Sequence, residues 1–192
     1  MDKPVVIIIN GFPGAGKTTL AKRLADDLRL PVLSRDGIYE TLFDALDCRA
    51  NGVPPMLAPA AFTVMYSTAA TLLAARQPII IEAFFGRPDL RSAEFLKLKQ
   101  QYDFKPLQVM CRADGEVLLE RYHARMGSEG RHGGHNDREW IEQEGNKERL
   151  LHEKLAPLSI GGTVVEADTT NQMFYAKLLE HVRSELLIAG SR

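Results

Sequence analysis

The sequence has few cysteines, the residues that stabilise many secreted and zinc-bound domains. Its 192 residues include only two, Cys48 and Cys111. With only two thiols, far apart in sequence, neither a disulfide framework nor a four-cysteine zinc site is recognisable. Small buried thiols in a reducing compartment are the simpler interpretation. Excess charge is missing too, since 24 Lys and Arg residues stand against 25 Asp and Glu residues. The chain therefore lacks the overall positive charge that polynucleotides and anionic membranes attract.

Long apolar runs and repeats are also missing. The first run, at positions 5–9, is too short for a signal peptide and is followed by Asn-Gly instead of a cleavage site. No stretch reaches the roughly 18 apolar residues that a membrane span needs. We therefore expect a cytoplasmic protein without a membrane partner, whose residues 1–192 form a single domain.

What the sequence does contain is an alternation of short β-branched runs with longer segments of helical period. Strands are predicted at 5–9, 32–33, 78–81, 107–111 and 163–167. Helices are predicted at 18–30, 37–46, 60–76, 88–101, 115–126, 137–155 (with Asp137 as N-cap) and 172–188. This order predicts an α/β fold with a parallel sheet and helices on both of its faces.

The most specific motif is GFPGAGKT at positions 11–18, which matches the phosphate-binding pattern G-x-x-x-x-G-K-[ST] at every fixed position. Glycines let backbone N–H groups converge on an anion, and the following helix directs its positive end to the same point. Lys17 would reach the β- and γ-phosphates, and the Thr18 hydroxyl would bind magnesium. The predicted ATP-binding residues here are Gly11, Phe12, Pro13, Gly14, Ala15, Gly16, Lys17, Thr18 and Thr19.

A phosphate loop alone does not separate kinases from GTPases, motors or sensors. The Asn-Lys-x-Asp motif that reads guanine does not occur in the sequence, and no GTPase glutamine or arginine apparatus is recognisable. The distinction must therefore come from residues near the other strand ends.

Acidic and basic residues follow the second and third predicted strands, where ligands of parallel sheets bind. Asp36, next to Arg35, could accept a proton from an acceptor hydroxyl or hold metal-bound water; alternatively it only caps the next helix. Glu82 ends the third strand, where it could hold magnesium or orient the substrate. Arg87 could bind an anionic part of the acceptor, or be a solvated loop residue.

Three arginines, Arg121, Arg125 and Arg131, lie before and within a loop rich in glycine and histidine at positions 127–137. The first two are four residues apart and share one helix face. We interpret the loop as a lid that closes over the transferring phosphate, and its two histidines as lid residues, too few for a metal site. The alternative is a solvated helix face neutralised by nearby acids.

On GFPGAGKTT, SRDGIYETL, IIIEAFFGRP and CRADGEVLLERYHAR with the following RHGGH, the chain resembles P-loop kinases of the adenylate-kinase-like fold. Within that fold it is most similar to small kinases with AAA-type ATPase domains. Relatives include the kinase half of polynucleotide kinases, chloramphenicol phosphotransferase, zeta-toxin kinases and gluconate kinases. The resemblance spans nearly the whole chain, although segment 48–60, a possible acceptor-site insertion, matches no subfamily.

This resemblance implies a role for several residues. Asp36 would activate the acceptor, and Arg121 and Arg125 would contact ATP. Asp168 and Thr169, in the sequence ADTTN, would pack on adenine. Glu82 stands where several relatives have Asp, which leaves its role in metal binding open.

The combined expectation is a three-layer P-loop NTPase fold with five parallel strands in the order 2-3-1-4-5. The protein would transfer the γ-phosphoryl group of Mg-ATP to a hydroxyl of a small-molecule acceptor, without tight binding of nucleic acid. Two alternatives stay open: a polynucleotide 5′-hydroxyl kinase, and an ATP-binding switch with little transfer activity. Nothing in the sequence specifies an oligomeric state.

Overall fold

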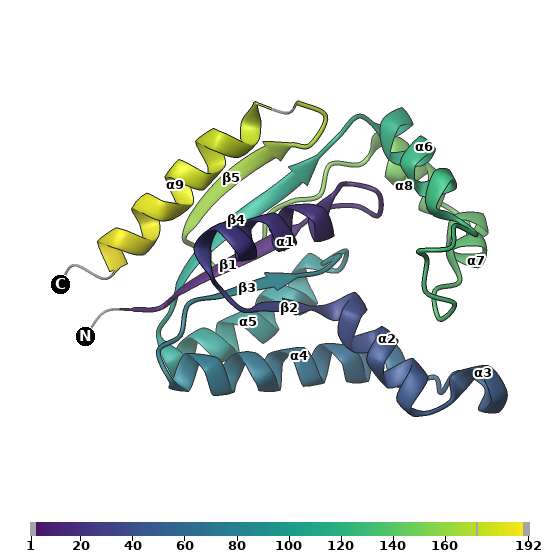
Figure 1. The fold of residues 1–192 in the computed structure, drawn as a ribbon, viewed down its shortest axis with the longest axis horizontal. Helices are drawn as coiled ribbons and strands as arrows, with labels where there is room; N and C mark the ends of the chain where they lie inside the picture. The colour runs from purple at the N-terminus through teal and green to yellow at the C-terminus, as the bar shows by residue number, and fades with distance from the viewer. Residues whose placement is uncertain (1–2, 172, 190–192) are drawn as a thin grey trace.

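The computed structural model describes residues 3–171 and 173–189, which form one five-stranded parallel sheet with helices around it (Figure 1). The strand order is β2-β3-β1-β4-β5, as the sequence analysis predicts. The strands are β1 (Val5–Asn10), β2 (Val32–Ser34), β3 (Ile79–Glu82), β4 (Lys105–Arg112) and β5 (Thr163–Asp168). The longer helices are α1 (Lys17–Leu28), α2 (Arg35–Ala45), α4 (Leu57–Ala74), α5 (Pro88–Tyr102), α6 (Gly115–Arg125) and α9 (Phe174–Ala189). The short ones are α3 (Cys48–Asn51), α7 (Asp137–Glu142) and α8 (Asn146–His152).

The central strand β1 explains the topology, because all six of its residues are buried. A strand buried on both faces needs an apolar side chain at nearly every position, as its sequence VVIIIN provides. It pairs in parallel with β3 and β4, and Ile9 lies opposite Glu82 of β3 and Val109 of β4. The carboxyl ends of the strands, and the residues that follow them, therefore meet at one edge of the sheet.

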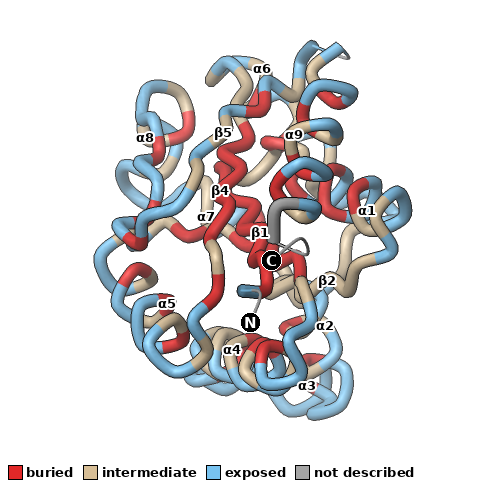
Figure 2. The backbone as a smooth tube through the Cα atoms, turned by 90° about the vertical axis from the view of Figure 1, so that its left-hand side faces the viewer, coloured by how far each residue is buried: buried red, intermediate tan, exposed pale blue. Residues whose placement is uncertain are grey.

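Helices cover both faces of this sheet (Figures 1 and 2). On one face, Ile7 and Ile9 belong to an apolar core with Leu24 of α1 and Val182 of α9. On the other face, Val6 and Ile8 pack in a second core with side chains of α4 and α5. The two cysteines are buried and free, as expected. The result is the three-layer arrangement of a P-loop NTPase.

The helices α2 and α3 and the segment α6–α8 lie beyond the carboxyl edge of the sheet (Figure 1). The first of these regions has its own small core, formed by Tyr39, Phe43, Cys48, Leu57 and Ala61. This core joins α2 and α3 to the start of α4. It explains why segment 48–60 is not the open loop that its glycine and prolines suggest: it contains α3 and the first turn of α4.

The predicted helix at 137–155 is wrong in its start and its continuity. Asn136 is the N-cap, and its side chain accepts a hydrogen bond from the backbone N–H of Glu139. The chain then leaves the helix at Gln143, where the backbone is extended, and Gly145 takes a left-handed conformation before α8 begins. Asp137 is therefore not the helix cap, and its carboxylate binds arginine side chains instead.

The expectation that no segment reaches the length of a membrane span is wrong for one helix. By length and composition α4 could cross a membrane, with 18 residues and a mean hydropathy of 1.4. Its buried residues, however, include Ala61, Met65, Ala69 and Leu73, spaced by four. Met65, Ala69 and Leu73 pack in the core beside the sheet, and Ala61 packs in the small core with α2 and α3, as expected for a core helix.

Candidate active site

The phosphate loop connects β1 to α1 and is shaped by its glycines. Gly14 and Gly16 have φ values of +87° and +74°, which are strained for any other residue. A Cβ atom at Gly14 would also lie 2.8 Å from the carbonyl oxygen of Leu118. Asn10 fixes the start of the loop, because its Oδ1 accepts hydrogen bonds from the N–H groups of Gly11 and Phe85. The start of the loop is therefore tied to the segment that follows β3.

Lys17, the first residue of α1, is almost fully buried at 9% exposure. Its ammonium group donates a hydrogen bond to the carbonyl oxygen of Phe12 at 3.0 Å. The charge thus lies inside the loop, close to the N–H groups of the first turn of α1. A phosphate seated in the loop would meet both this charge and the positive end of the helix.

Glu82, at the end of β3, joins the phosphate loop to β2. Its carboxylate, 1% exposed, accepts hydrogen bonds from Thr18 at 3.3 Å and from Ser34 at 2.8 Å. Burial raises the pKa of Glu82, and the nearby positive charge of Lys17 only partly offsets this rise. A further positive charge at this point would therefore be favourable.

These residues fit a magnesium ion that is shared with a nucleotide. Thr18, Ser34 and Glu82 supply hard oxygen atoms, and the buried carboxylate lacks full neutralisation. Within residues 3–171 and 173–189, no cluster of three or more His, Cys, Asp or Glu residues could hold a metal by itself. Magnesium commonly takes one or two protein oxygens and completes its shell with phosphate and water.

Asp36 lies in the first turn of α2, but it is not the helix cap. The N-cap is Ser34, whose hydroxyl accepts a hydrogen bond from the N–H of Gly37. The Asp36 carboxylate instead binds the guanidinium of Arg35 at 3.0 Å, and its side chain is 43% exposed. Burial alone would raise the pKa of Asp36, but the charges of Arg35 and Lys17 outweigh it and lower the pKa. Asp36 is therefore ionised at neutral pH and reachable from the cavity.

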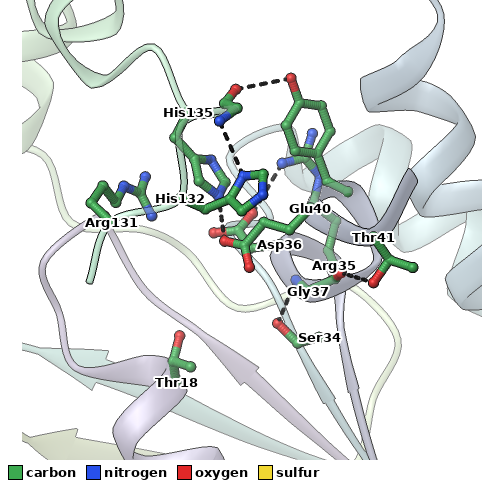
Figure 3. Close-up of polar contacts among 12 residues, drawn as sticks. Thr18, Ser34, Arg35, Asp36, Gly37, Glu40, Thr41, Arg131, His132 and His135 are labelled. Atoms are coloured by element: carbon green, nitrogen blue, oxygen red, sulfur yellow. Dashed lines mark hydrogen bonds and ion pairs between the residues drawn. The ribbon is translucent and has the colours of Figure 1, made fainter. Parts of the chain in front are cut away.

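Two cavities meet at this carboxylate. The larger, about 660 Å³, runs from the phosphate loop and is lined by Gly14, Gly16, Lys17, Thr18, Thr19, Leu20, Arg23, Asp36, Arg121, Arg125, Arg131, Thr169, Phe174 and Tyr175. The smaller, about 340 Å³, lies between α2 and the lid. Both are lined by Asp36, Arg125 and Arg131. Figure 3 shows Thr18, Asp36 and Arg131 around a common space, although they come from three separate segments.

Asp137 holds two arginines at this junction, Arg125 at the end of α6 and Arg131 in the lid loop. Its carboxylate accepts hydrogen bonds from Arg131 at 2.6 and 2.7 Å and from Arg125 at 3.0 Å. The Tyr122 hydroxyl donates to the Asp137 carbonyl oxygen at 2.8 Å. Burial would raise the pKa of Asp137, but Arg131 and Arg125 lower it below its usual value. One carboxylate thus orients two guanidinium groups, and one positive charge is left over for a ligand.

The lid loop at 127–137 packs on α2 through its histidines. The Nε2 atom of His135 lies 2.7 Å from Glu40 (Figure 3). The Nε2 atom of His132 lies 3.2 Å from the Asp44 carboxylate. The Tyr39 hydroxyl donates a hydrogen bond to the carbonyl oxygen of Gly134 at 3.1 Å. These contacts connect the lid to the helix that carries Asp36.

The far end of the large cavity lies beside the loop after β5. Arg121 donates to the hydroxyl and the carbonyl oxygen of Thr169 at 3.1 and 3.3 Å. Arg23 stacks over the ring of Tyr175, with 3.5 Å between the guanidinium carbon and the ring centroid. A flat, partly cationic surface of this kind suits a nucleobase. The carboxylate of Asp168 turns away, because it binds the N–H and hydroxyl of Thr170 and lines a different cavity.

The structure therefore brings together most of the residues predicted from sequence and separates a few. Lys17, Thr18, Asp36, Glu82 and the three arginines converge on the two cavities or, for Glu82, on the Thr18 hydroxyl beneath them. Arg35 lines the smaller cavity. Arg87 is exposed, precedes α5 and lines neither cavity. From segment 48–60, only Ala58 lines the smaller cavity.

Sequence reasoning missed two groups of residues. The first comprises Arg23, Phe174 and Tyr175 in the larger cavity. The second is the aromatic wall of the smaller cavity, formed by Tyr39, Phe62, Phe84, Tyr122 and Trp140. Scattered aromatic residues carry no local motif, so only the fold shows that they share a site.

Comparison with known proteins gives a family and a fold. Residues 6–150 match the family described as an AAA domain. A sequence search of curated proteins found no match. Among solved structures, a protein from Chloroflexus aurantiacus J-10-fl, described as a candidate kinase, has 32% sequence identity and a TM-score of 0.81, with 98% of this chain and 99% of that chain covered.

More distant structures share the fold alone. Kti12 from Chaetomium thermophilum, in complex with ADP-AlF3, has 15% identity and a TM-score of 0.64 over 94% of this chain and 98% of that chain. Shikimate kinase from Acinetobacter baumannii, in complex with shikimate, has 16% identity and a TM-score of 0.52 over 99% and 96%. Nucleotide binding is implied by the family match together with the phosphate loop that connects β1 to α1.

Proposed function

The chain belongs to the AAA domain family, and on that premise we propose that it is a kinase that transfers the γ-phosphoryl group of Mg-ATP to a hydroxyl of a small-molecule acceptor. The observation that carries this proposal is the junction of the two cavities. The larger begins at the phosphate loop, the smaller has the volume of a small ligand, and they share Asp36, Arg125 and Arg131. A donor and an acceptor can therefore meet at an ionised carboxylate and two guanidinium groups.

Each group then has a role in the transfer. The N–H groups of the loop and Lys17 hold the β- and γ-phosphates, and Arg23 stacked on Tyr175 offers a surface for the base. Thr18 would hold Mg²⁺ directly and Glu82 through water, and the ion would neutralise charge on the phosphate oxygens. Asp36 orients the acceptor hydroxyl and takes its proton as the oxygen bonds to the γ-phosphorus, while the bond from that phosphorus to the β,γ-bridging oxygen breaks and ADP leaves.

The arginines act on the charge of the transferring group. Arg125 and Arg131 face the junction from the lid side and would donate hydrogen bonds to the γ-phosphate oxygens in the transition state. Because Asp137 already orients both side chains, little reorganisation is needed when the phosphate arrives. An ATP-binding switch would need neither a second cavity nor a carboxylate at its mouth.

The proposal is tested by screening a library of alcohols for ATP-dependent phosphorylation, with products identified by mass spectrometry. Asp36→Asn keeps the size of the side chain but cannot take a proton, so transfer should fall about 100-fold or more. ATP affinity should stay within a few-fold. The control is Asp89→Asn, an exposed residue in the first turn of α5 that lines neither cavity. Transfer by Asp36→Asn at nearly the parental rate would contradict the proposed role of Asp36.

A further inference from the structure

The smaller cavity, which we call the acceptor cavity, is lined by both charged and aromatic side chains. Its charged side chains include Arg35, Asp36, Arg125 and Arg131, of which the last three also line the larger cavity. The guanidinium groups of Arg35 and Arg125 lie over the rings of Phe62 and Tyr122, at 5.3 and 4.4 Å from the ring centroids. Aromatic and aliphatic side chains form much of the rest: Pro13, Tyr39, Ala58, Phe62, Phe84, Tyr122 and Trp140. An acceptor that presents its hydroxyl to Asp36 must therefore place the remainder of its body against this aromatic wall.

The aromatic wall is held in place by contacts between its own rings. Phe84 lies 5.5 Å from Phe12 of the phosphate loop and 6.3 Å from Trp140 of α7, measured between ring centroids. Trp140 in turn lies 5.4 Å from Tyr122 of α6. Phe62, Phe84 and Trp140 are only half-buried, so part of each ring remains accessible. Ring pairs at such distances favour fixed edge-to-face or offset arrangements, which makes the wall a preformed surface.

Several polar groups beside this wall already have partners elsewhere in the protein, whereas the buried Nε atom of Arg35 has none among the described residues. The Tyr39 hydroxyl donates to Gly134, and the Tyr122 hydroxyl donates to the Asp137 carbonyl oxygen. The Nε2 atom of His135 pairs with Glu40. A second or third hydroxyl on the acceptor would lose its hydrogen bonds to water here and find few replacements.

We infer that the acceptor is an alcohol whose hydroxyl is attached to a compact apolar, ring-bearing body, instead of a polyol, a sugar or a sugar acid. This inference rests on the proposed function, because it assumes that the acceptor cavity holds the phosphoryl acceptor. The volume of about 340 Å³ lies near the lower limit for small-molecule sites, about 300 Å³. It suits one ring system with a short hydroxylated side chain.

Trp140 makes the test direct, since it is the single tryptophan of the sequence and it lines the acceptor cavity. Its fluorescence is titrated with 2-phenylethanol and 1-phenyl-1,2-ethanediol, and separately with glycerol and D-gluconate, in protein saturated with ADP. We expect a saturable change with both aryl alcohols, at a Kd at least tenfold below that of either polyol. A polyol that binds as tightly, or the lack of a saturable response to both aryl alcohols, would overturn the inference.

Substitutions in the aromatic wall show whether the aryl alcohols bind in the acceptor cavity. Phe84→Leu keeps an apolar side chain but removes the ring, and should raise the Kd of the aryl alcohols about tenfold. Phe62→Leu is a second variant of the same wall, in case the first unfolds. Tyr102→Leu on α5, outside both cavities, is the control. If neither wall variant weakened binding beyond this control, the aryl alcohols would be bound elsewhere and the inference would be wrong.

The test of the ligand class and the test of the kinase activity can fail independently of each other. If aryl alcohols bind at Trp140 but are not phosphorylated, the proposed kinase activity is contradicted, and the inferred chemical class of the ligand is supported. If polyols are phosphorylated and aryl alcohols do not bind, the proposed kinase activity is supported, and the inferred chemical class of the ligand is wrong.

Discussion

The most informative single substitution away from the reacting atoms is Asp137→Asn. The parent carboxylate accepts three hydrogen bonds from Arg125 and Arg131, and its side chain is only 10% exposed. Asparagine offers one carbonyl oxygen in place of two and turns an N–H group toward the guanidinium groups. We expect both arginines to lose their fixed orientation.

The size of the effect follows from burial. Removing one partner of a buried ion pair costs about 3–5 kcal/mol. The side chains of Arg131 and Arg125 are 19% and 30% exposed, so water can replace part of what they lose. We therefore expect a loss of about 2 kcal/mol, which lowers the melting temperature of a domain of this size by about 4–8 °C.

The same substitution has a defined pH dependence. Since the pKa of Asp137 is lowered in the folded protein, its contribution to stability is complete above the ordinary carboxyl pKa of about 4. The contribution disappears as the pH falls through the lowered native value. The melting curves of parent and variant should differ at pH 7 and converge in strong acid.

Catalysis should suffer more than stability, because displaced arginines no longer meet the γ-phosphate. We expect kcat to fall about 100-fold, with the ATP dissociation constant changed only a few-fold. The assays are differential scanning calorimetry from neutral pH into strong acid and steady-state ADP release, with Asp89→Asn as the control. A variant with parental melting temperature and kcat would refute the argument that Asp137 orients the arginines.

Four further predictions follow from other parts of the site. Lys17→Ala should abolish productive ATP binding or turnover while the melting temperature changes little; parental affinity and turnover in calorimetry and ADP-release assays would contradict the phosphate-loop role. The parent should lose stability as pH rises through the raised native pKa of Glu82, and Glu82→Gln should abolish this loss. The same variant should need about tenfold more magnesium for turnover. Unchanged magnesium dependence would mean that Glu82 has a structural role only. Segment 127–136, with four glycines in ten residues, should gain protection from hydrogen exchange on addition of a non-hydrolysable ATP analogue, and equal exchange in both states would argue against a lid. Single-stranded oligonucleotides should not bind at submicromolar concentration at physiological salt, and salt-sensitive binding together with 5′-phosphorylation would favour a polynucleotide kinase.

The parts of the site that sequence predicts well are those set by local backbone chemistry. A strand, a glycine loop and a helix in succession define the phosphate loop, so Lys17 and Thr18 could be placed before the fold was known. Asp36 and Glu82 follow from the rule that ligands bind at the carboxyl ends of parallel strands. The sheet order comes from resemblance to a fold, and the structure confirms it.

The parts that sequence predicts poorly depend on contacts between distant segments. Tyr39 and Gly134 are 95 positions apart and yet share a hydrogen bond. The position of Asp137 at a predicted helix start suggested a cap, but the neighbouring Asn136 took that role and left the carboxylate to the arginines. Arg87 was chosen for its nearness to Glu82 in sequence, yet the turn after β3 leaves it exposed. In each case tertiary packing decided between two locally reasonable options.

The central claim is that the γ-phosphoryl group of ATP passes to an acceptor hydroxyl at the junction of the two cavities. Phosphorus NMR follows this group directly, in reactions that contain Mg-ATP and an acceptor found by the library screen. We predict that the γ-phosphate signal is replaced by that of a phosphomonoester in equal amount to the ADP formed, and that Asp36→Asn slows this conversion about 100-fold or more. Formation of ADP with inorganic phosphate alone, at the same rate in parent and Asp36→Asn, would contradict the account.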